Sequence, residues 1–91
     1  MSLSLRKKSA VAAAKAAGMD GLLVTHLPDV RYLCGFTGSN AALALAGGRA
    51  VLFTDGRYTA QAKAEAVGTR VVIAKKPAVA AACEWLDNAG V

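Results

Sequence analysis

Histidine, acidic residues and cysteine are scarce in this 91-residue chain, which has one histidine, six acidic residues and two cysteines. The histidine, His26, follows an apolar run and precedes a Leu-Pro pair, where loop and capping roles are common. The carboxylates are scattered and form no pairs at a spacing that suggests a metal site. A two-metal hydrolytic centre needs several converging oxygen and nitrogen ligands, which these residues cannot supply. We therefore expect a non-catalytic domain with no catalytic residue, metal or cofactor of its own.

Other nucleophile and cofactor patterns are missing too. Ser39 lacks the strand, Gly-x-Ser-x-Gly and helix context of a hydrolase nucleophile. The segment Gly35–Asn40, GFTGSN, has neither the lysine of a phosphate-binding loop nor the third glycine of a dinucleotide-binding loop. Cys34 and Cys83 lie far apart, without a second ligand at metal spacing, and each falls on an apolar stripe. For Cys83 this stripe has the helical spacing of Val79, Ala82, Cys83 and Leu86. We expect both to be buried free thiols.

Long hydrophobic runs and secretory signals are also absent. Although 55% of the residues are hydrophobic, no stretch approaches the roughly 20 apolar residues of a membrane-spanning helix, and the N-terminus has no signal-peptide pattern. We therefore expect a soluble, cytoplasmic domain without a membrane partner. The net charge is +5, but the basic residues are scattered and accompany no nucleic-acid-binding motif. A solvated helix surface explains them better than a nucleic-acid partner does.

The chain does contain short apolar runs, alanine-rich helical patterns and turn glycines in alternation. Helical spacing and capping residues predict helices near residues 5–17, 28–34, 55–67 and 78–88. Apolar runs predict strands near residues 22–25, 41–46, 50–54 and 70–74, with Gly47-Gly48 as the turn of an antiparallel hairpin. This order predicts an α/β fold in which helices flank a mixed β-sheet. The last helix leads to no further strand, so we expect residues 1–91 to be one domain, truncated at its C-terminal end.

Two short motifs stand out within this pattern. The first, Tyr32–Asn40 or YLCGFTGSN, combines glycines with small polar side chains that can hold a loop in one shape by bonding to neighbouring backbone. An exposed Phe36 is expected in this loop, packed on something outside the domain. The second, Leu52–Tyr58 or LFTDGRY, is interpreted as a strand-to-helix corner.

At this corner Asp55 is expected to cap the following helix and Gly56 to turn the chain. Arg57 is expected to pair with a nearby carboxylate or with carbonyl groups, and Tyr58 to pack its ring against the sheet. A guanidinium at this place also suits the carboxylate of a ligand. We favour the structural interpretation.

Together the motifs resemble the N-terminal domain of Xaa-Pro aminopeptidases and Xaa-Pro dipeptidases (prolidases), the group that includes creatinase. The matching segments are Ala17–Thr25 (AGMDGLLVT), Val30–Asn40 (VRYLCGFTGSN), and Leu52–Tyr58 followed by Gln61, Ala62 and Glu65. The motif residues expected to have structural roles are Arg31, Tyr32, Gly35, Gly38, Asp55, Gly56, Arg57 and Tyr58. Asp29 and Cys34 depart from the asparagine and the threonine or serine that are common there.

The resemblance implies a ribonuclease-H-like domain that precedes a larger "pita-bread" catalytic domain, which is absent from this chain. That second domain would hold two divalent metal ions (manganese, cobalt or zinc) and hydrolyse a bond to proline. The N-terminal domain would mediate contacts in a homo-oligomer and shape the active-site mouth, its own or a neighbour's. Phe36, Ser39 and Asn40 are the residues expected at that mouth, near a proline-containing peptide.

Two alternatives stay open. The chain could be a free-standing binding module on the same fold, or the N-terminal domain of a creatinase-like amidinohydrolase. The sequence beyond Val91 separates them, because a catalytic domain would show spaced aspartates, a histidine and glutamates.

Overall fold

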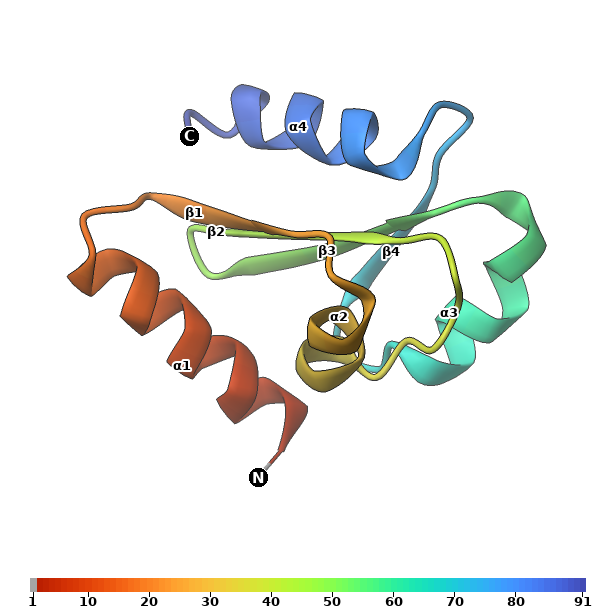
Figure 1. Cartoon of the computed structure of the whole chain (residues 1–91), viewed down its shortest axis with the longest axis horizontal. Coiled ribbons are helices and arrows are strands. Elements are labelled where there is room, and N and C mark those ends of the chain that lie inside the picture. The colour runs from red at the N-terminus through yellow and green to blue at the C-terminus, as the bar shows by residue number, and fades with distance from the viewer. Residues whose placement is uncertain (1) are drawn as a thin grey trace.

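A mixed sheet of four strands lies at the centre of the computed structural model, which describes residues 2–91 (Figure 1). The strands follow one another across the sheet in chain order: β1 (Gly21–Val24), β2 (Ala42–Ala46), β3 (Arg49–Thr54) and β4 (Arg70–Ile73). The first three are antiparallel, and β4 runs parallel to β3. The predicted mixed α/β sheet is confirmed, and each strand begins and ends within one residue of its predicted bounds.

The β2–β3 hairpin determines which loops meet. Its turn residues Gly47 and Gly48 have φ values of 56° and 78°, and positive φ at both central positions is characteristic of two-residue hairpins. The register places Ala46 opposite Arg49 and Ala42 opposite Phe53. The start of β2 therefore lies beside the end of β3, so the segment before β2 and the segment after β3 meet at the same end of the sheet.

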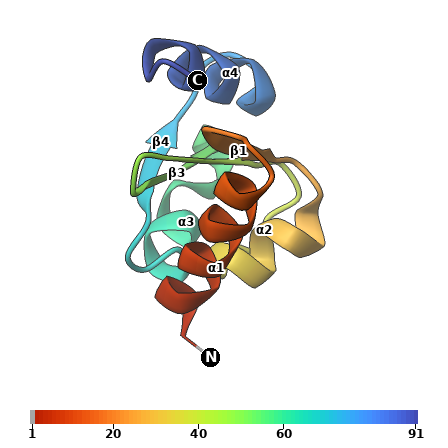
Figure 2. The same ribbon diagram turned by 90° about the vertical axis from the view of Figure 1, so that its left-hand side faces the viewer.

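Helices cover both faces of the sheet (Figures 1 and 2). Helices α1 (Leu3–Ala16), α2 (Leu27–Cys34) and α3 (Thr59–Glu65) lie on one face, and α4 (Ala78–Asn88) lies alone on the other. The side chain of Ser2 caps α1 by accepting a hydrogen bond from the Leu5 amide at 3.2 Å. Within residues 2–91, none of the helices is both long and apolar enough to cross a membrane.

Alternation along β2 and β3 divides the core between the two faces. The larger cluster, beneath α1, α2 and α3, contains leucines of both strands, and its buried members are Val30, Leu33, Cys34, Phe36, Ala41, Leu43, Leu45, Leu52, Ala62 and Ala66. The smaller cluster, beneath α4, is formed by Ala42, Ala44, Val51, Phe53, Ala78 and Ala82. Alanines on both sides of this second interface let α4 pack close to the sheet.

The helix predicted near residues 55–67 differs from the structure. A short 3₁₀ helix, η1 (Gly56–Tyr58), follows β3, and α3 ends at Glu65. The Asp55 carboxylate accepts a hydrogen bond from the amide of Arg57, only two residues on. This bond closes a tight turn, so Asp55 does act as an N-cap, as predicted, but of η1 rather than of one long helix.

The predicted apolar face of α4 is confirmed only in part: Ala82 is buried and Leu86 packs against the smaller cluster, but Val79 and Cys83 do not. Val79 is 44% exposed and Cys83 is exposed, whereas Ala78 and Ala82 are buried. The prediction that Cys34 is a buried free thiol is confirmed, but Cys83 is a free thiol on the surface. Ala78 and Ala82 belong to the same cluster as Ala42 and Ala44 of β2, so the helix is rotated away from the predicted face, toward Ala78.

Candidate functional site

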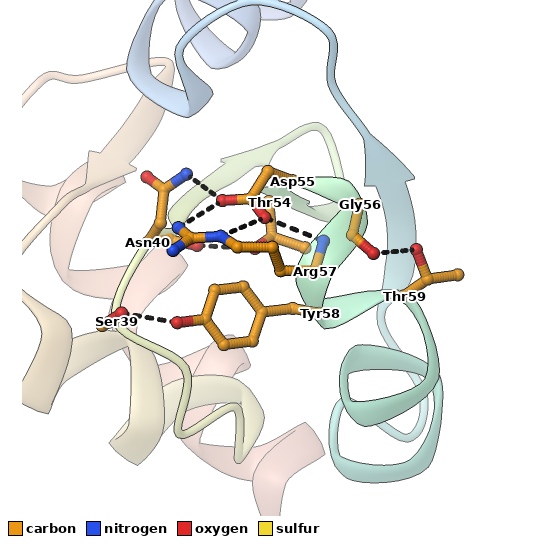
Figure 3. A network of polar contacts seen from close by, with 8 residues as sticks. All are labelled: Ser39, Asn40, Thr54, Asp55, Gly56, Arg57, Tyr58 and Thr59. Atoms are coloured by element: carbon orange, nitrogen blue, oxygen red, sulfur yellow. Dashed lines mark hydrogen bonds and ion pairs between the residues drawn. The ribbon is translucent and has the colours of Figure 1, made fainter.

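The loop 35–40, between α2 and β2, meets the corner 55–58, which follows β3 (Figure 3). The hairpin register brings the two motifs of the sequence together, because β2 begins where β3 ends. The Thr54 hydroxyl donates to the backbone carbonyl of Asn40 at 2.6 Å, and Thr54 is fully buried. One end of the loop is therefore fixed directly to the last residue of β3.

Asp55 is the acceptor at the centre of the first contact between loop and corner. Its Oδ2 accepts from the Asn40 amide Nδ2 at 2.7 Å and from Arg57 Nη2 at 2.9 Å. Its Oδ1 accepts from the backbone N and the Nε of Arg57, at 2.9 Å and 3.0 Å. The paired donors of a guanidinium match the two oxygens of a carboxylate. The expected pairing of Arg57 with a nearby carboxylate is thus confirmed.

These bonds shift the ionisation of both partners. The hydrogen bonds from Arg57, followed by that from Asn40, lower the pKa of Asp55 far below its usual range. The same bond to Asp55 raises the pKa of Arg57. Both groups are therefore charged at neutral pH, and the Asn40 amide is directed at a carboxylate inside the domain.

A second contact holds the other end of the loop. The Glu65 carboxylate at the end of α3 accepts from the Thr37 amide at 2.9 Å and from the Thr37 hydroxyl at 2.9 Å and 3.0 Å. Gln61 Nε2 donates to Glu65 at 3.1 Å and to the Thr37 hydroxyl at 3.0 Å. The bond from the Thr37 amide is the largest cause of a lowered pKa for Glu65. This role of Thr37, Gln61 and Glu65 was not predicted, although Gln61 and Glu65 lie four residues apart, on one face of a helix.

Aromatic packing fills the space between the two contacts. Phe36 is 1% exposed, so the expectation that it is exposed is wrong. Its ring meets that of Tyr58 edge to face, with centroids 5.6 Å apart and planes at 88°. Gly38 lies against both rings: a Cβ added there would lie 2.2 Å from Phe36 Cζ and 3.0 Å from Tyr58 Cδ1. Phe36 is buried because the absence of a side chain at Gly38 leaves room for its ring.

The hydroxyls of Ser39 and Tyr58 form an exposed pair where the loop meets the corner. Their oxygens lie 2.5 Å apart, and this bond is the largest cause of a lowered pKa for Tyr58 (Figure 3). Ser39 itself is exposed. Either oxygen can donate to the other, so the pair can present a donor or an acceptor to a neighbouring group.

A groove of about 380 Å³ runs between α2 and the loop. Its lining residues come from one turn of α2 and from the loop, and they are Leu27, Pro28, Arg31, Phe36, Thr37, Gly38 and Ser39. Arg31 is exposed at its side, and the edge of the buried Phe36 contributes to its floor. The groove is thus part apolar and part polar, with one cation.

The remaining motif residues are structural or lie at the surface. Gly35 ends α2 with φ 87°, and a Cβ there would lie 2.9 Å from the Glu65 carbonyl oxygen. Gly56 opens η1, with nothing within 4 Å of an added Cβ. Tyr32 is 53% exposed, and the guanidinium of Arg6 lies 4.6 Å from the centroid of its ring.

Metal-binding side chains do not gather in the part of the chain that the structure describes. No group of three or more histidine, cysteine, aspartate or glutamate side chains among residues 2–91 is placed to hold a metal ion. The carboxylates of Asp55 and Glu65 already accept bonds from Arg57, Asn40 and Thr37. The residues present therefore do not fit a two-metal centre.

Comparisons with known proteins agree with this geometry. The family model for the creatinase/prolidase N-terminal domain matches residues 6–91. A peptidase of Bacillus subtilis, YqhT, described as uncharacterized, is 44% identical over 55 residues, which are 60% of this chain and 16% of that protein.

Solved structures show the same fold. An XXA-pro aminopeptidase from Streptococcus pyogenes matches with a TM-score of 0.85 and 34% identity, over 97% of this chain and 67% of that one. The N-terminal domain of the cytoplasmic peptidase PepQ from Mycobacterium tuberculosis matches with a TM-score of 0.75 and 44% identity, over 78% and 56%. An Xaa-Pro dipeptidase from Bacillus anthracis gives 0.89 and 28%, over 98% and 25%.

The chain spans only part of each of these proteins, from 16% of the Bacillus subtilis peptidase to 67% of the Streptococcus pyogenes chain. The family model, in contrast, covers this chain almost from end to end. With the mixed sheet and the joined loop and corner, the match shows that the chain belongs to the creatinase/prolidase N-terminal domain family.

Proposed function

We propose that the chain is the non-catalytic N-terminal domain of a proline-specific metallopeptidase, an Xaa-Pro aminopeptidase or Xaa-Pro dipeptidase. Its catalytic partner would be a second domain of the same protein, and the two divalent metal ions (manganese, cobalt or zinc) would belong there. The relatives support this proposal, because two of them are described as an aminopeptidase and a dipeptidase acting at Xaa-Pro. The relative described as a cytoplasmic peptidase supports a cytoplasmic location.

The observation that carries the proposal is the way the loop 35–40 is held. Hydrogen bonds to the carboxylates of Asp55 and Glu65 hold the loop in place, and the buried Phe36 ring fills the space between these two contacts. A loop constrained in this way loses little conformational entropy when it meets a ligand. We infer that the loop forms a rigid wall of an active-site mouth, in its own subunit or in a neighbouring one.

The three mouth residues have different parts in this proposal. Asn40 donates to Asp55, so it positions the loop. Phe36 is buried and supports the floor of the groove. Ser39 is exposed beside the Tyr58 hydroxyl and is the group suited to direct contact with a peptide. Arg31, exposed at the side of the groove, is suited to an acceptor oxygen of the peptide.

Contacts between subunits are part of the proposal as well. Several large apolar side chains on the surface would gain from being covered, and they are Leu5, Met19, Leu23, Tyr32, Val67, Ile73, Val79 and Val91. Covering such side chains removes apolar area from water. They support docking against the catalytic domain and against further copies in a homo-oligomer.

The test uses the full-length gene product, loaded with manganese, and steady-state hydrolysis of an Xaa-Pro dipeptide and a longer Xaa-Pro peptide. Ser39→Ala is expected to raise KM by about 2- to 10-fold, the worth of one neutral hydrogen bond, with kcat and metal content unchanged. Ser9→Ala, at an exposed serine on α1, is the matched control. The isolated 91-residue chain is expected to cleave neither peptide.

Four results would contradict the proposal. Unchanged KM and kcat in Ser39→Ala would show that the loop does not contact the substrate at the active-site mouth. Metal-dependent cleavage by the isolated chain would make the domain catalytic. A gene that ends shortly after Val91 would favour a free-standing module, and hydrolysis of creatine by the full-length protein would favour an amidinohydrolase.

A further inference from the structure

A second groove, of about 410 Å³, lies between α1 and the turn of the β2–β3 hairpin. It is at the opposite end of the sheet from the loop 35–40, because β2 begins after that loop and ends at the turn. Most of its lining comes from one face of α1, and the lining residues are Ser4, Lys7, Lys8, Val11, Ala12, Lys15, Leu45, Gly48, Arg49, Ala50 and Gly68. The groove is therefore separate from the site proposed above, and the inference does not depend on that function.

The groove is lined by positively charged side chains and by no negatively charged ones. Lys7, Lys8 and Lys15 line it, and no aspartate or glutamate does. The Lys7 ammonium donates to the Thr69 hydroxyl at 2.7 Å, which is a neutral partner. None of the three lysines takes part in an ion pair among residues 2–91. An anionic partner would thus gain attraction without having to displace an internal carboxylate.

The floor of the groove is apolar. Leu45 belongs to the buried core beneath α1, and Val11 and Ala50 pack against that core. No aromatic side chain lines the groove, so it lacks the stacking surfaces on which proteins bind unpaired bases. Lysines at the rim and aliphatic side chains at the floor match a peptide that carries both carboxylates and apolar side chains.

The length of the groove limits the size of such a segment. Ser4 and Lys15 lie eleven residues apart on α1, which corresponds to about 16 Å along the helix axis. An extended peptide advances about 3.3 Å per residue, so about five residues would fill the groove. A second copy of this groove is an unsuitable occupant, because it carries the same charge.

We propose that the groove between α1 and the β2–β3 turn docks an extended acidic segment of a partner protein, about five residues long, in which carboxylates alternate with apolar side chains. The lysines of α1 pair with the carboxylates, and Val11, Leu45 and Ala50 receive the apolar side chains. Binding should weaken with salt, as expected for exposed ion pairs.

The experiment measures fluorescence anisotropy of a labelled Glu-Leu-Glu-Leu-Glu-Leu-Glu peptide titrated with the 91-residue chain. The double variant Lys8→Glu, Lys15→Glu is expected to bind at least about tenfold more weakly, since two attractions become repulsions. The double variant Lys63→Glu, Lys75→Glu makes the same change in net charge at exposed lysines outside the groove and is expected to keep its affinity within about twofold. Ala12→Glu, which adds a carboxylate inside the groove and leaves all three lysines in place, is expected to weaken binding as well.

Further probes separate the other possible occupants. An all-serine-and-glutamate peptide of equal charge should bind more weakly than the Glu-Leu peptide. Equal loss in the two lysine double variants would overturn the proposal in favour of non-specific charge attraction. Tighter binding of a single-stranded oligonucleotide than of the peptide would overturn it in favour of nucleic acid. Loss of peptide binding in the full-length protein would show that the protein's own chain fills the groove, and would also overturn it.

Discussion

Replacing Gly38 with alanine tests whether the loop 35–40 has the packed interior that the structure describes. The added Cβ would lie 2.2 Å from Phe36 Cζ and 2.6 Å from Phe36 Cε2. Both distances are far shorter than the separation of carbon atoms in contact, about 3.5–4.0 Å. Phe36 is 1% exposed and cannot move its ring outward without disturbing the core. The substitution should therefore be destabilising because of steric conflict alone.

Overpacking of this kind costs about 1–3 kcal/mol in the free energy of unfolding. In a domain of this size, a loss of about 2 kcal/mol lowers the melting temperature by about 8–16 °C. The effect should depend on Phe36, because leucine at position 36 has no atoms where Cζ and Cε2 lie. In a Phe36→Leu background, Gly38→Ala should cost less by about 1 kcal/mol or more, as a double-mutant cycle measures for residues in contact.

Urea denaturation followed by circular dichroism gives the four free energies of unfolding that the cycle requires. Gly56→Ala is the matched control: nothing lies within 4 Å of its Cβ, so it should leave stability unchanged or raise it by about 0.4–1 kcal/mol. The reasoning is refuted if Gly38→Ala is as stable as Gly56→Ala, or if its cost is the same with leucine at position 36.

Two further measurements address ionisation and thiol accessibility. The pKa values of Asp55 and Glu65 are lower in the folded chain than their ordinary values, which are about 4, so their contribution to stability is complete above that pH and is lost as the pH falls below it. Urea midpoints should fall on acidification, and the fall should be shallower in Asp55→Asn and Glu65→Gln. An equally steep fall in both variants would contradict this. Cys83 is exposed and Cys34 is buried, and burial raises the pKa of the Cys34 thiol. Iodoacetamide should therefore label only Cys83 in the native chain and both thiols in urea, with mass spectrometry as the readout; native labelling of Cys34 would be inconsistent with its burial.

The strands were predictable because local signals define each of them. Turn glycines bound the hairpin, and short apolar runs mark the buried strands. The face of α4 was not predictable from helical spacing alone. The spacing predicts one face with Val79, Ala82, Cys83 and Leu86. In the structure the helix is rotated so that Ala78 and Ala82 are buried while Val79 and Cys83 are exposed. The rotation of α4 about its axis depends on its packing against β2 and β3, which are distant from it in the sequence.

The burial of Phe36 was missed for a related reason. A phenylalanine between two glycines in a polar loop fits an exposed position, since glycine and small polar residues are typical of the surface. The ring is buried because Gly38, two residues on, and Tyr58, from the corner after β3, leave a space of its size. The local sequence of the loop does not indicate that Gly38 and Tyr58 pack around Phe36, so the burial of its ring could not be predicted from that sequence.

The contact between Asn40 and Asp55, in contrast, follows from the sequence once the hairpin register is accepted. With a two-residue turn at Gly47-Gly48, residues at equal distances before and after the turn pair with each other, so that Ala42 pairs with Phe53. Continuing the same register two positions further places Asn40 opposite Asp55, and their side chains are joined at 2.7 Å. Residues on facing strands lie about 4.5–5.5 Å apart, which an amide and a carboxylate can span. The two motifs are therefore one structural unit. A one-residue shift of the turn would separate Asn40 from Asp55 and reverse every side chain of β2 between the two faces of the sheet.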